Sequence, residues 1–237
     1  MDKQDLRERV WDALEASGAA RFPFPPHGRI PNFEGAAEVA DRLAARPEWQ
    51  AAEVVKANPD APQLPVRRRA LREGKTVYMA VPRLRDENCF LELDPARIDD
   101  VDAAATISHV DDYAVRVGPE AVPTVDLVVS GSVAVTESGA RVGKGEGYSD
   151  LEFAVLREFG RVDDATPVAT TVHERQVIAE AVPVDAHDVA LDLVVTPERT
   201  VETGRSGSEG RPAGVDWDLL DAERRREIPV LDRLDRP

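Results

Sequence analysis

The chain has 237 residues, 42% of them hydrophobic and 5% aromatic, which suits one large α/β domain or two small ones with a substantial core. Its formal net charge is −15, because 45 Asp and Glu residues outnumber 30 Lys and Arg residues. This negative field disfavours non-specific binding to nucleic acid or to an anionic membrane, so any phosphate site must be a local positive pocket.

The basic residues are unevenly divided, with only four Lys among the 30, while Ala and Val stand where larger apolar residues are usual. We interpret this composition as adaptation to a high-salt cytoplasm, in which an acidic surface keeps a protein hydrated. An ordinary acidic mesophilic enzyme is the alternative.

Several features predict a soluble, cytoplasmic protein. Cys89 is the only cysteine, so no intrachain disulfide can form, and a buried structural role for it is favoured over a nucleophilic one. The N-terminal segment is charged and lacks the apolar stretch of a signal peptide. No apolar run is long enough to span a bilayer.

The first third of the chain alternates between helical and extended patterns. Leu6, Val10 and Leu14 fall on one helix face, and four prolines between positions 22 and 33 require an extended loop. The expected elements are a helix over 2–17, the loop 22–33, a helix over 34–45, a strand over 52–58, a helix over 65–73 and a strand over 75–82.

The rest of the chain continues this alternation after a mixed stretch. Residues 83–123 contain a possible strand, "CFLEL", and a short helical segment near Ala103. The elements expected beyond it are a strand over 125–135, a helix over 148–159, and strands over 167–173 and 190–197. The alternation predicts an α/β fold with a layered, mostly parallel sheet flanked by helices. We expect one domain over 1–202, followed by a flexible linker (203–214) and a short helical extension to residue 237.

A glycine cluster, "RVGKGEGYSDLE", lies between the expected strand 125–135 and the expected helix 148–159. Glycines at 143, 145 and 147 would let backbone N–H groups approach an anion at the start of that helix, with Lys144 and Arg141 adding positive charge. Glu146 opposes this interpretation. The spacing matches neither a Walker loop nor a dinucleotide-binding fingerprint. A phosphate site and a purely structural turn both remain open on spacing alone.

Several separated motifs resemble the 5-formyltetrahydrofolate cyclo-ligase family, also called methenyltetrahydrofolate synthetases. The segment "VDLVVSGSVAVTESGARVGKGEGYSDLEFAVL" resembles the family's central segment, and "VPVDAHDVALDLVVT" is similar to a downstream motif. "GKTVYMAVPRL" and the pair Lys3 and Arg7 also fit the family pattern. "RIPNFEGA", "VVKANPDAPQLPVR" and the C-terminal "GVDWDLLDAERRREIPVLDRL" are closer to its divergent methenyltetrahydrofolate synthetase domain-containing branch.

The resemblance implies a fold in the sugar-phosphate isomerase and CoA-transferase-like group. It also implies an ATP- and Mg²⁺-dependent reaction that converts 5-formyltetrahydrofolate to 5,10-methenyltetrahydrofolate with release of ADP and phosphate. Such a reaction depends mainly on positioning and on positive charge around the γ-phosphoryl group. A small-molecule substrate, either a reduced folate or a related pterin, and a monomeric, cytoplasmic enzyme are therefore expected, with no nucleic-acid or membrane partner.

The resemblance also implies roles for individual residues. Those expected to meet the nucleotide are Lys3, Arg7, Arg141, Gly143, Lys144, Gly145, Glu146, Gly147 and Tyr148. Within this set Arg141, Lys144 and Tyr148 would act at the reacting groups, and Asp150, with Asp188 as a weaker candidate, would hold Mg²⁺. The plainer alternatives are a solvated helix face for Lys3 and Arg7, and a first-turn carboxylate favoured by the helix dipole for Asp150.

The sequence departs from the family pattern at four points. Ser149 replaces a second tyrosine, Leu151 replaces an arginine, and Glu146 replaces the middle glycine. The family's pterin-holding glutamate has no equivalent in "NPDAPQLP", although Glu146 is a conceivable substitute. These departures leave open a non-catalytic relative that binds nucleotide or folate as a regulator or scaffold. A third possibility is another enzyme of the same fold group that acts on a phosphorylated substrate.

Overall fold

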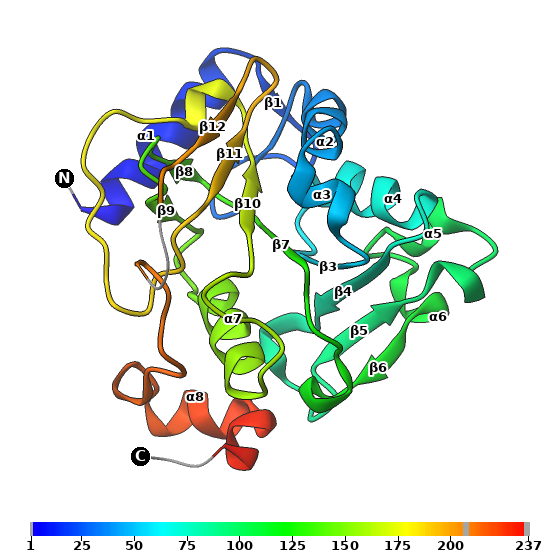
Figure 1. Ribbon diagram of the computed structural model, residues 1–237. Coiled ribbons are helices and arrows are strands. Elements are labelled where there is room, and N and C mark those ends of the chain that lie inside the picture. Colours follow the sequence, from blue (N-terminus) through cyan, green and yellow to red (C-terminus); the bar gives the residue numbers. More distant parts are fainter. Residues whose placement is uncertain (1, 206–208, 235–237) are drawn as a thin grey trace.

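An eight-stranded sheet runs through the computed structural model, which describes residues 2–205 and 209–234 (Figure 1). In spatial order the strands are β12 (Thr200–Glu202), β11 (Leu193–Val195), β10 (Val168–Thr171), β7 (Leu127–Ser130), β3 (Val54–Ala57), β4 (Thr76–Ala80), β5 (Phe90–Leu93) and β6 (Val115–Val117). The five from β11 to β4 are parallel to their neighbours, and β12, β5 and β6 extend the two edges antiparallel. The predicted α/β class with a mostly parallel sheet is confirmed.

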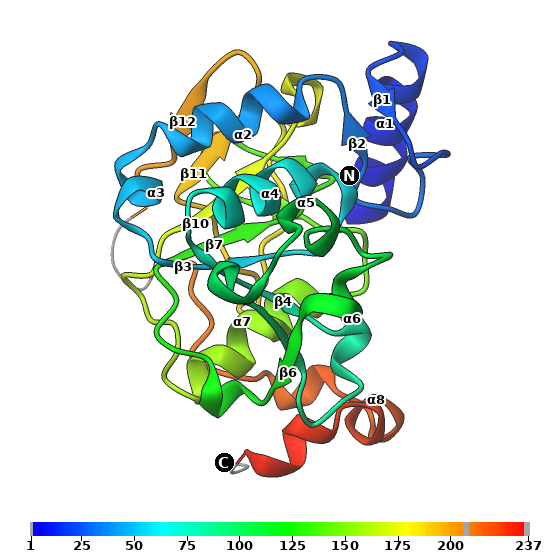
Figure 2. The ribbon, with the colours of Figure 1, turned by 90° about the vertical axis from the view of Figure 1, so that its right-hand side faces the viewer.

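Helices cover both faces of this sheet. On one face α2 (Ala36–Ala44) and α4 (Leu64–Arg72) pack against each other and against the central strands, whereas α7 (Tyr148–Glu158) lies on the opposite face (Figure 2). The short helices α3 (Pro47–Ala51), α5 (Val101–Ala104) and α6 (Val110–Tyr113) lie in the connections. Because both faces are covered, a central strand such as β7 is buried along its whole length, which explains its unbroken run of apolar residues.

A second, smaller core forms beside the sheet around the N-terminal helix α1 (Lys3–Ala16). Leu6, Val10 and Leu14 of α1 are buried against a hairpin of β8 (Ala134–Val135) and β9 (Arg141–Val142). Asp2 caps α1 by accepting hydrogen bonds from the next turn, as its position before the helix favours. The proline-rich loop is closed by a two-stranded sheet of β1 (Ala20–Arg21) and β2 (Asn32–Phe33).

The single strand expected over residues 125–135 is wrong. The chain leaves the main sheet after Ser130 and re-forms extended structure only at β8, where it pairs with β9. The Gly131 amide donates a hydrogen bond to Asn58 Oδ1 instead of continuing the ladder. This break carries the chain away from the sheet towards the glycine cluster.

The C-terminal segment is folded onto the body of the protein. Its α8 (Ala222–Glu227) agrees with the expected short helix, and apolar residues on either side of α8, including Leu220, Ile228 and Leu231, are buried in the main core. Residues 206–208 of the expected linker lie outside the described residues. The described parts on either side are held, since the Thr203 amide donates to the Asp192 carbonyl and the Arg211 guanidinium pairs with the Asp192 carboxylate.

No helix within residues 2–205 and 209–234 combines the length and the apolar character that crossing a bilayer would require.

Candidate functional site

A cavity of about 520 Å³ opens where several strands of the main sheet end. Its lining includes residues that directly follow β3, β4 and β7, namely Asn58, Asp60, Val81 and Gly131. β3 and β7 are adjacent, but from β3 the chain crosses to β4 on one side and from β7 to β10 on the other. Such a change of direction leaves a crevice at the carboxyl ends of parallel strands, where α/β proteins commonly bind ligands.

The glycine cluster forms one wall of this cavity. Gly145 and Gly147 have φ values of +110° and +70°, a region that residues with a Cβ atom rarely adopt, and Gly147 is the N-cap of α7. No backbone amide from Gly143 to Asp150 donates a hydrogen bond to any residue that the structure describes. Consecutive unpaired amides at a helix start form a site suited to an anion.

Three of the predicted cationic residues lie at this loop. Lys144 and Arg141 line the cavity, and the Arg7 Nε donates a hydrogen bond of 2.7 Å to the Gly143 carbonyl. Burial lowers the pKa of Arg7, although not enough to remove its charge at neutral pH. α1 therefore carries Arg7 to the loop from the second core, and its contact with the nucleotide stays a prediction.

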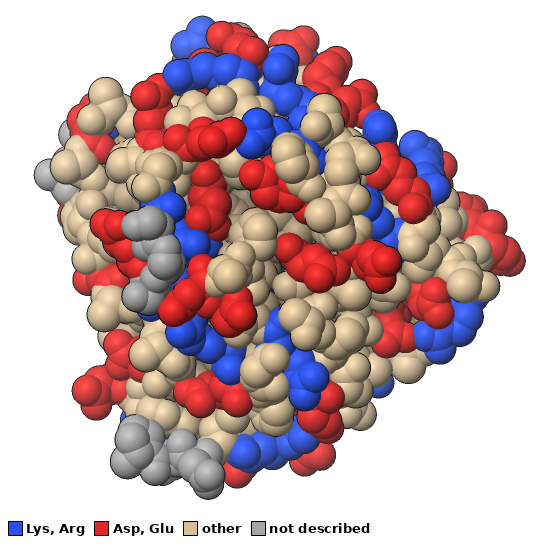
Figure 3. Space-filling view, in the orientation of Figure 1, with Lys and Arg blue, Asp and Glu red and all other residues tan. Residues whose placement is uncertain are grey.

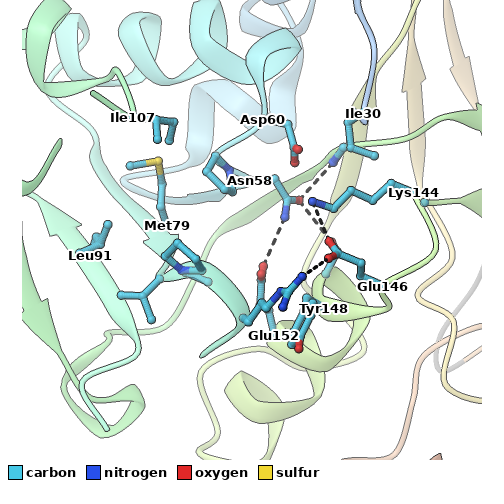
Figure 4. A pocket seen from close by; sticks show the side chains of 18 of the residues that line it. Ile30, Asn58, Asp60, Met79, Leu91, Ile107, Lys144, Glu146, Tyr148 and Glu152 are labelled. Carbon is cyan, nitrogen blue, oxygen red and sulfur yellow. Dashed lines mark hydrogen bonds and ion pairs between the residues drawn. The ribbon is translucent and has the colours of Figure 1, made fainter. Parts of the chain in front are cut away.

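Glu146 is neutralised by two cations on either side of it. Its carboxylate is 2.8 Å from Lys144 Nζ and 3.2 Å from Arg83 Nη2, and the pKa of Glu146 is lowered chiefly by the Lys144 hydrogen bond (Figure 4). Because these pairs offset its charge, Glu146 does not repel an anion as strongly as its sequence position suggested.

Arg141 and Asp150 form a buried ion pair behind the loop. Arg141 Nη2 is 2.5 Å from Asp150 Oδ1, the same oxygen accepts from the Val189 amide, and Arg141 Nη1 donates to the Gly131 carbonyl. Burial alone would lower the pKa of Arg141, but the charge and hydrogen bond of Asp150 outweigh it, so the pKa is raised. Asp150 Oδ2 has no partner among the described residues, which leaves one oxygen for a ligand.

Lys3 and Asp188 do not line the cavity. Lys3 Nζ contacts Asp185 at 2.9 Å and Asp188 at 2.7 Å, and the three form an ion-pair group with His187 nearby. Of the two predicted magnesium ligands only Asp150 lines the cavity, although the loop that carries Asp188 reaches Asp150 through the Val189 amide.

Asp60 is the carboxylate that sequence reasoning missed. It lines the cavity beside Gly131, where a Cβ atom would lie 3.2 Å from Asp60 Oδ2. Its carboxylate makes no hydrogen bond or ion pair with the described residues, and it does not cap the short 3-10 turn that follows. Burial raises the pKa of Asp60, and Lys144 opposes this only in part. The signal was present in "NPDAPQLP", directly after β3, but the expected residue there was a glutamate.

The opposite wall of the cavity is apolar. Met79, Leu91 and Ile107 face the glycine loop across the opening, and Asn58 and Glu152 lie between the two walls (Figure 4). Glu152 is held by the buried Lys56 and by Asn58 Nδ2. The cavity therefore offers an apolar surface for a flat ring, a free carboxylate and an anion-binding loop.

Comparison with known proteins places this geometry in context. The model of the 5-formyltetrahydrofolate cyclo-ligase family matches residues 1–197. A methenyltetrahydrofolate synthase domain-containing protein of Mus musculus is 43% identical over 239 residues, which cover 99% of this chain and 63% of the relative. The corresponding protein of Homo sapiens is 39% identical over 236 residues, with 98% of this chain and 61% of the relative covered. The chain thus spans less than two thirds of the length of these relatives.

A solved structure shares the fold. The NMR structure of Aquifex aeolicus 5,10-methenyltetrahydrofolate synthetase superposes with a TM-score of 0.53 at 21% identity, covering 87% of this chain and 95% of that chain. The similarity covers nearly all of the Aquifex aeolicus chain, which is the shorter of the two. The two proteins therefore share the α/β architecture described above.

Proposed function

Because the chain belongs to the 5-formyltetrahydrofolate cyclo-ligase family, we propose that it converts 5-formyltetrahydrofolate to 5,10-methenyltetrahydrofolate, with conversion of ATP to ADP and phosphate, the phosphate leaving with the formyl oxygen. The observation that carries this proposal is the run of unpaired amides from Gly143 to Asp150 in the wall of the cavity. A loop of this kind serves a reaction that transfers a phosphoryl group.

ATP and Mg²⁺ fit the residues that surround the loop. When bound, ATP would supply the phosphoryl group that activates the formyl oxygen, and Mg²⁺ would offset its charge. Lys144 and the loop amides would bind the phosphates, while Arg7 fixes the loop through the Gly143 carbonyl. Arg141 would stabilise the transferred group from its buried position. Asp150 would offer one oxygen to Mg²⁺, which accepts few protein ligands alongside phosphates and waters.

The folate ring would lie between the loop and the apolar wall. A reduced pterin presents N–H donors on one edge, and a carboxylate that pairs with them discriminates strongly against rings without these donors. Asp60 is suited to this task because its carboxylate is free and faces the cavity. We assign to Asp60 the role of the glutamate found in the family, and to Tyr148 the boundary between ring and nucleotide.

A non-catalytic relative that binds nucleotide or folate is the second candidate. The observation in its favour is Leu151, which is buried where the family carries an arginine, so this position supplies no cation. Binding without turnover would follow if the remaining cations hold the ligands but leave the transferred group without enough positive charge.

The test is turnover of purified protein with 5-formyltetrahydrofolate, ATP and Mg²⁺ in molar KCl, followed by the near-ultraviolet absorbance of the methenyl product. Lys144→Ala should weaken Mg-ATP binding in calorimetry, and Lys75→Ala, remote from the cavity, is its matched control. Folded protein that binds ATP but forms no product would support the binding relative. Absence of ATP binding by the folded wild-type protein would rule out the cyclo-ligase and the nucleotide-binding relative, and would leave only a relative that binds folate.

A further inference from the structure

An arginine of the C-terminal segment contacts the glycine loop from outside the cavity. Arg224 Nη2 donates a hydrogen bond of 2.5 Å to the Glu146 carbonyl, and the Arg224 guanidinium lies 4.8 Å from the centre of the Tyr148 ring. The same Nη2 is 3.7 Å from the point where a Cβ atom on Gly147 would lie. Arg224 therefore contacts Glu146 and Tyr148 and lies close to Gly147 between them, and it lies beyond the residues that the family model matches.

The C-terminal segment holds Arg224 firmly in this position. Asp221 caps α8 by accepting a hydrogen bond of 2.8 Å from the Arg224 amide, and Glu227 pairs with Arg85 at 2.9 Å. Ile228 and Leu231, just after α8, are almost completely buried. The arginine thus projects from a segment that is anchored in the main core (Figure 1).

The loop itself has few internal restraints. Its amides donate no hydrogen bond to the residues that the structure describes, and two of its glycines have positive φ, so its own backbone does not hold its shape. Side chains hold it instead. Arg7 binds the Gly143 carbonyl and Arg224 the Glu146 carbonyl, from the two ends of the described chain, and Arg83 and Lys144 pair with the Glu146 carboxylate. Binding to a pre-ordered loop avoids the entropy lost when a mobile loop is ordered by its ligand.

We propose that Arg224 is a positioning residue that fixes the glycine loop in the conformation that accepts phosphate. The part of this inference that concerns phosphate rests on the proposed function. The part that concerns the order of the loop does not. Arginine suits both contacts, because its planar guanidinium stacks on an aromatic ring while its N–H groups donate to a carbonyl, which lysine cannot do in the same way.

The experiment compares wild-type protein with Arg224→Ala and Arg224→Lys, with Arg226→Ala as a matched control on the exposed side of α8. The order parameters of the Gly145 and Gly147 amides are measured by ¹⁵N relaxation without ligand. We expect values of about 0.85 in the wild type and in Arg226→Ala, and values of about 0.6 or lower in Arg224→Ala. The Kd for Mg-ATP should rise roughly tenfold in Arg224→Ala, since a mobile loop must be ordered on binding.

The lysine variant separates position from charge. Arg224→Lys keeps the positive charge but should leave the loop nearly as mobile as it is in Arg224→Ala. If the alanine variant does not fold, the lysine variant provides the comparison with the wild type. Unchanged order parameters in both variants, or full recovery of loop order with lysine, would overturn the proposal. If the loop becomes more mobile in the variants but the wild-type protein binds no Mg-ATP, the positioning role of Arg224 stands and the proposed function is refuted instead.

Discussion

Two carboxylates of the cavity differ in their electrostatic surroundings. Glu146 lies between Lys144 and Arg83, and its pKa is lowered. Asp60 has no partner among the described residues, and burial raises its pKa. Folding raises the pKa of such a carboxylate above its unfolded value of about 3.9. Its protonation stabilises the folded state fully only below the unfolded pKa, and this stabilisation is lost as the pH rises through the folded pKa. Asp60 therefore opposes folding once the pH lies above its folded pKa, a cost that a ligand-binding role would justify.

Replacing Asp60 should separate stability from function. We expect Asp60→Asn to raise the free energy of unfolding at pH 7 by about 1 kcal/mol, because it removes an unpaired buried charge, and to weaken folate binding at least tenfold. Urea unfolding and folate titration measure the two effects. The gain in stability should shrink as the pH falls and disappear below the unfolded pKa of about 3.9, where the carboxylate is neutral in both states. A variant that is less stable at pH 7 would show that Asp60 has a structural partner.

Asp150 is expected to matter for stability as much as for ligand binding. Arg141 is buried, and Asp150 compensates its charge. Asp150→Asn should lower the free energy of unfolding by about 3 kcal/mol, because it leaves the buried guanidinium without a counter-ion. Asp164→Asn, which breaks a partly exposed pair with Arg157, should cost less stability than Asp150→Asn and is the control. Equal stability of the two variants in urea would contradict this role for Asp150.

At the scale of elements, long periodic segments were predictable and short or polar ones were not. The apolar spacing of Leu6, Val10 and Leu14 predicted α1 within two residues at its ends. β6 and β12 were missed because edge strands of three residues with exposed side chains leave no alternating pattern. The break after Ser130 was missed because it depends on a hydrogen bond to Asn58, which is 73 positions away along the chain.

The same distinction holds for the site. The glycine loop could be predicted, since three glycines before a helix form a local pattern. The availability of Asp60 and the pairing of Asp150 with Arg141 could not, because both depend on which side chains the fold brings close together. Arg224 lies in the C-terminal segment that resembles the divergent branch, but its contact with the loop could not be predicted, because it depends on how that segment packs.

The conformation of the glycine loop gives a prediction at the scale of this element. Gly145→Ala should lower the free energy of unfolding by about 1–2 kcal/mol, because a Cβ atom at φ +110° is strained and would lie 3.4 Å from the Arg7 guanidinium. Gly160 also has positive φ, but no atom lies within 4 Å of its Cβ position, so Gly160→Ala tests the backbone strain without a steric contact. Mg-ATP binding should weaken in Gly145→Ala alone. Equal losses of binding in the two variants would contradict a special role for the loop.

At the scale of the whole molecule, acidic side chains outnumber basic ones although the two kinds are interspersed on the face shown in Figure 3. We propose that the excess of 15 negative charges is an adaptation to high salt. Raising KCl from about 0.1 M to 1 M shortens the Debye length from ~10 Å to ~3 Å and reduces the mutual repulsion. The exposed ion pairs lose little by the same screening, because each contributes little.

Thermal unfolding tests this proposal directly. We expect the Tm to rise by about 5 °C or more between 0.1 M and 1 M KCl, measured by calorimetry at constant pH. Sucrose at matched osmolality is the control, since it stabilises proteins without screening charge. A Tm that stays constant or falls with KCl would favour an ordinary acidic protein.

The two arginines that hold the glycine loop also bear on the order in which the molecule assembles. Arg7 and Gly143 are 136 positions apart, and Arg224 and Glu146 are 78 positions apart. In the sheet, β4 pairs with the nearby β5, and the central pair of Val55 in β3 with Leu127 in β7 spans 72 positions. Contacts between distant positions close late during folding, since a large loop must be ordered before they form. The sheet can therefore exist before its binding loop is set. On mild heating or in low denaturant, this protein should lose its ligand affinity while its secondary structure is still intact.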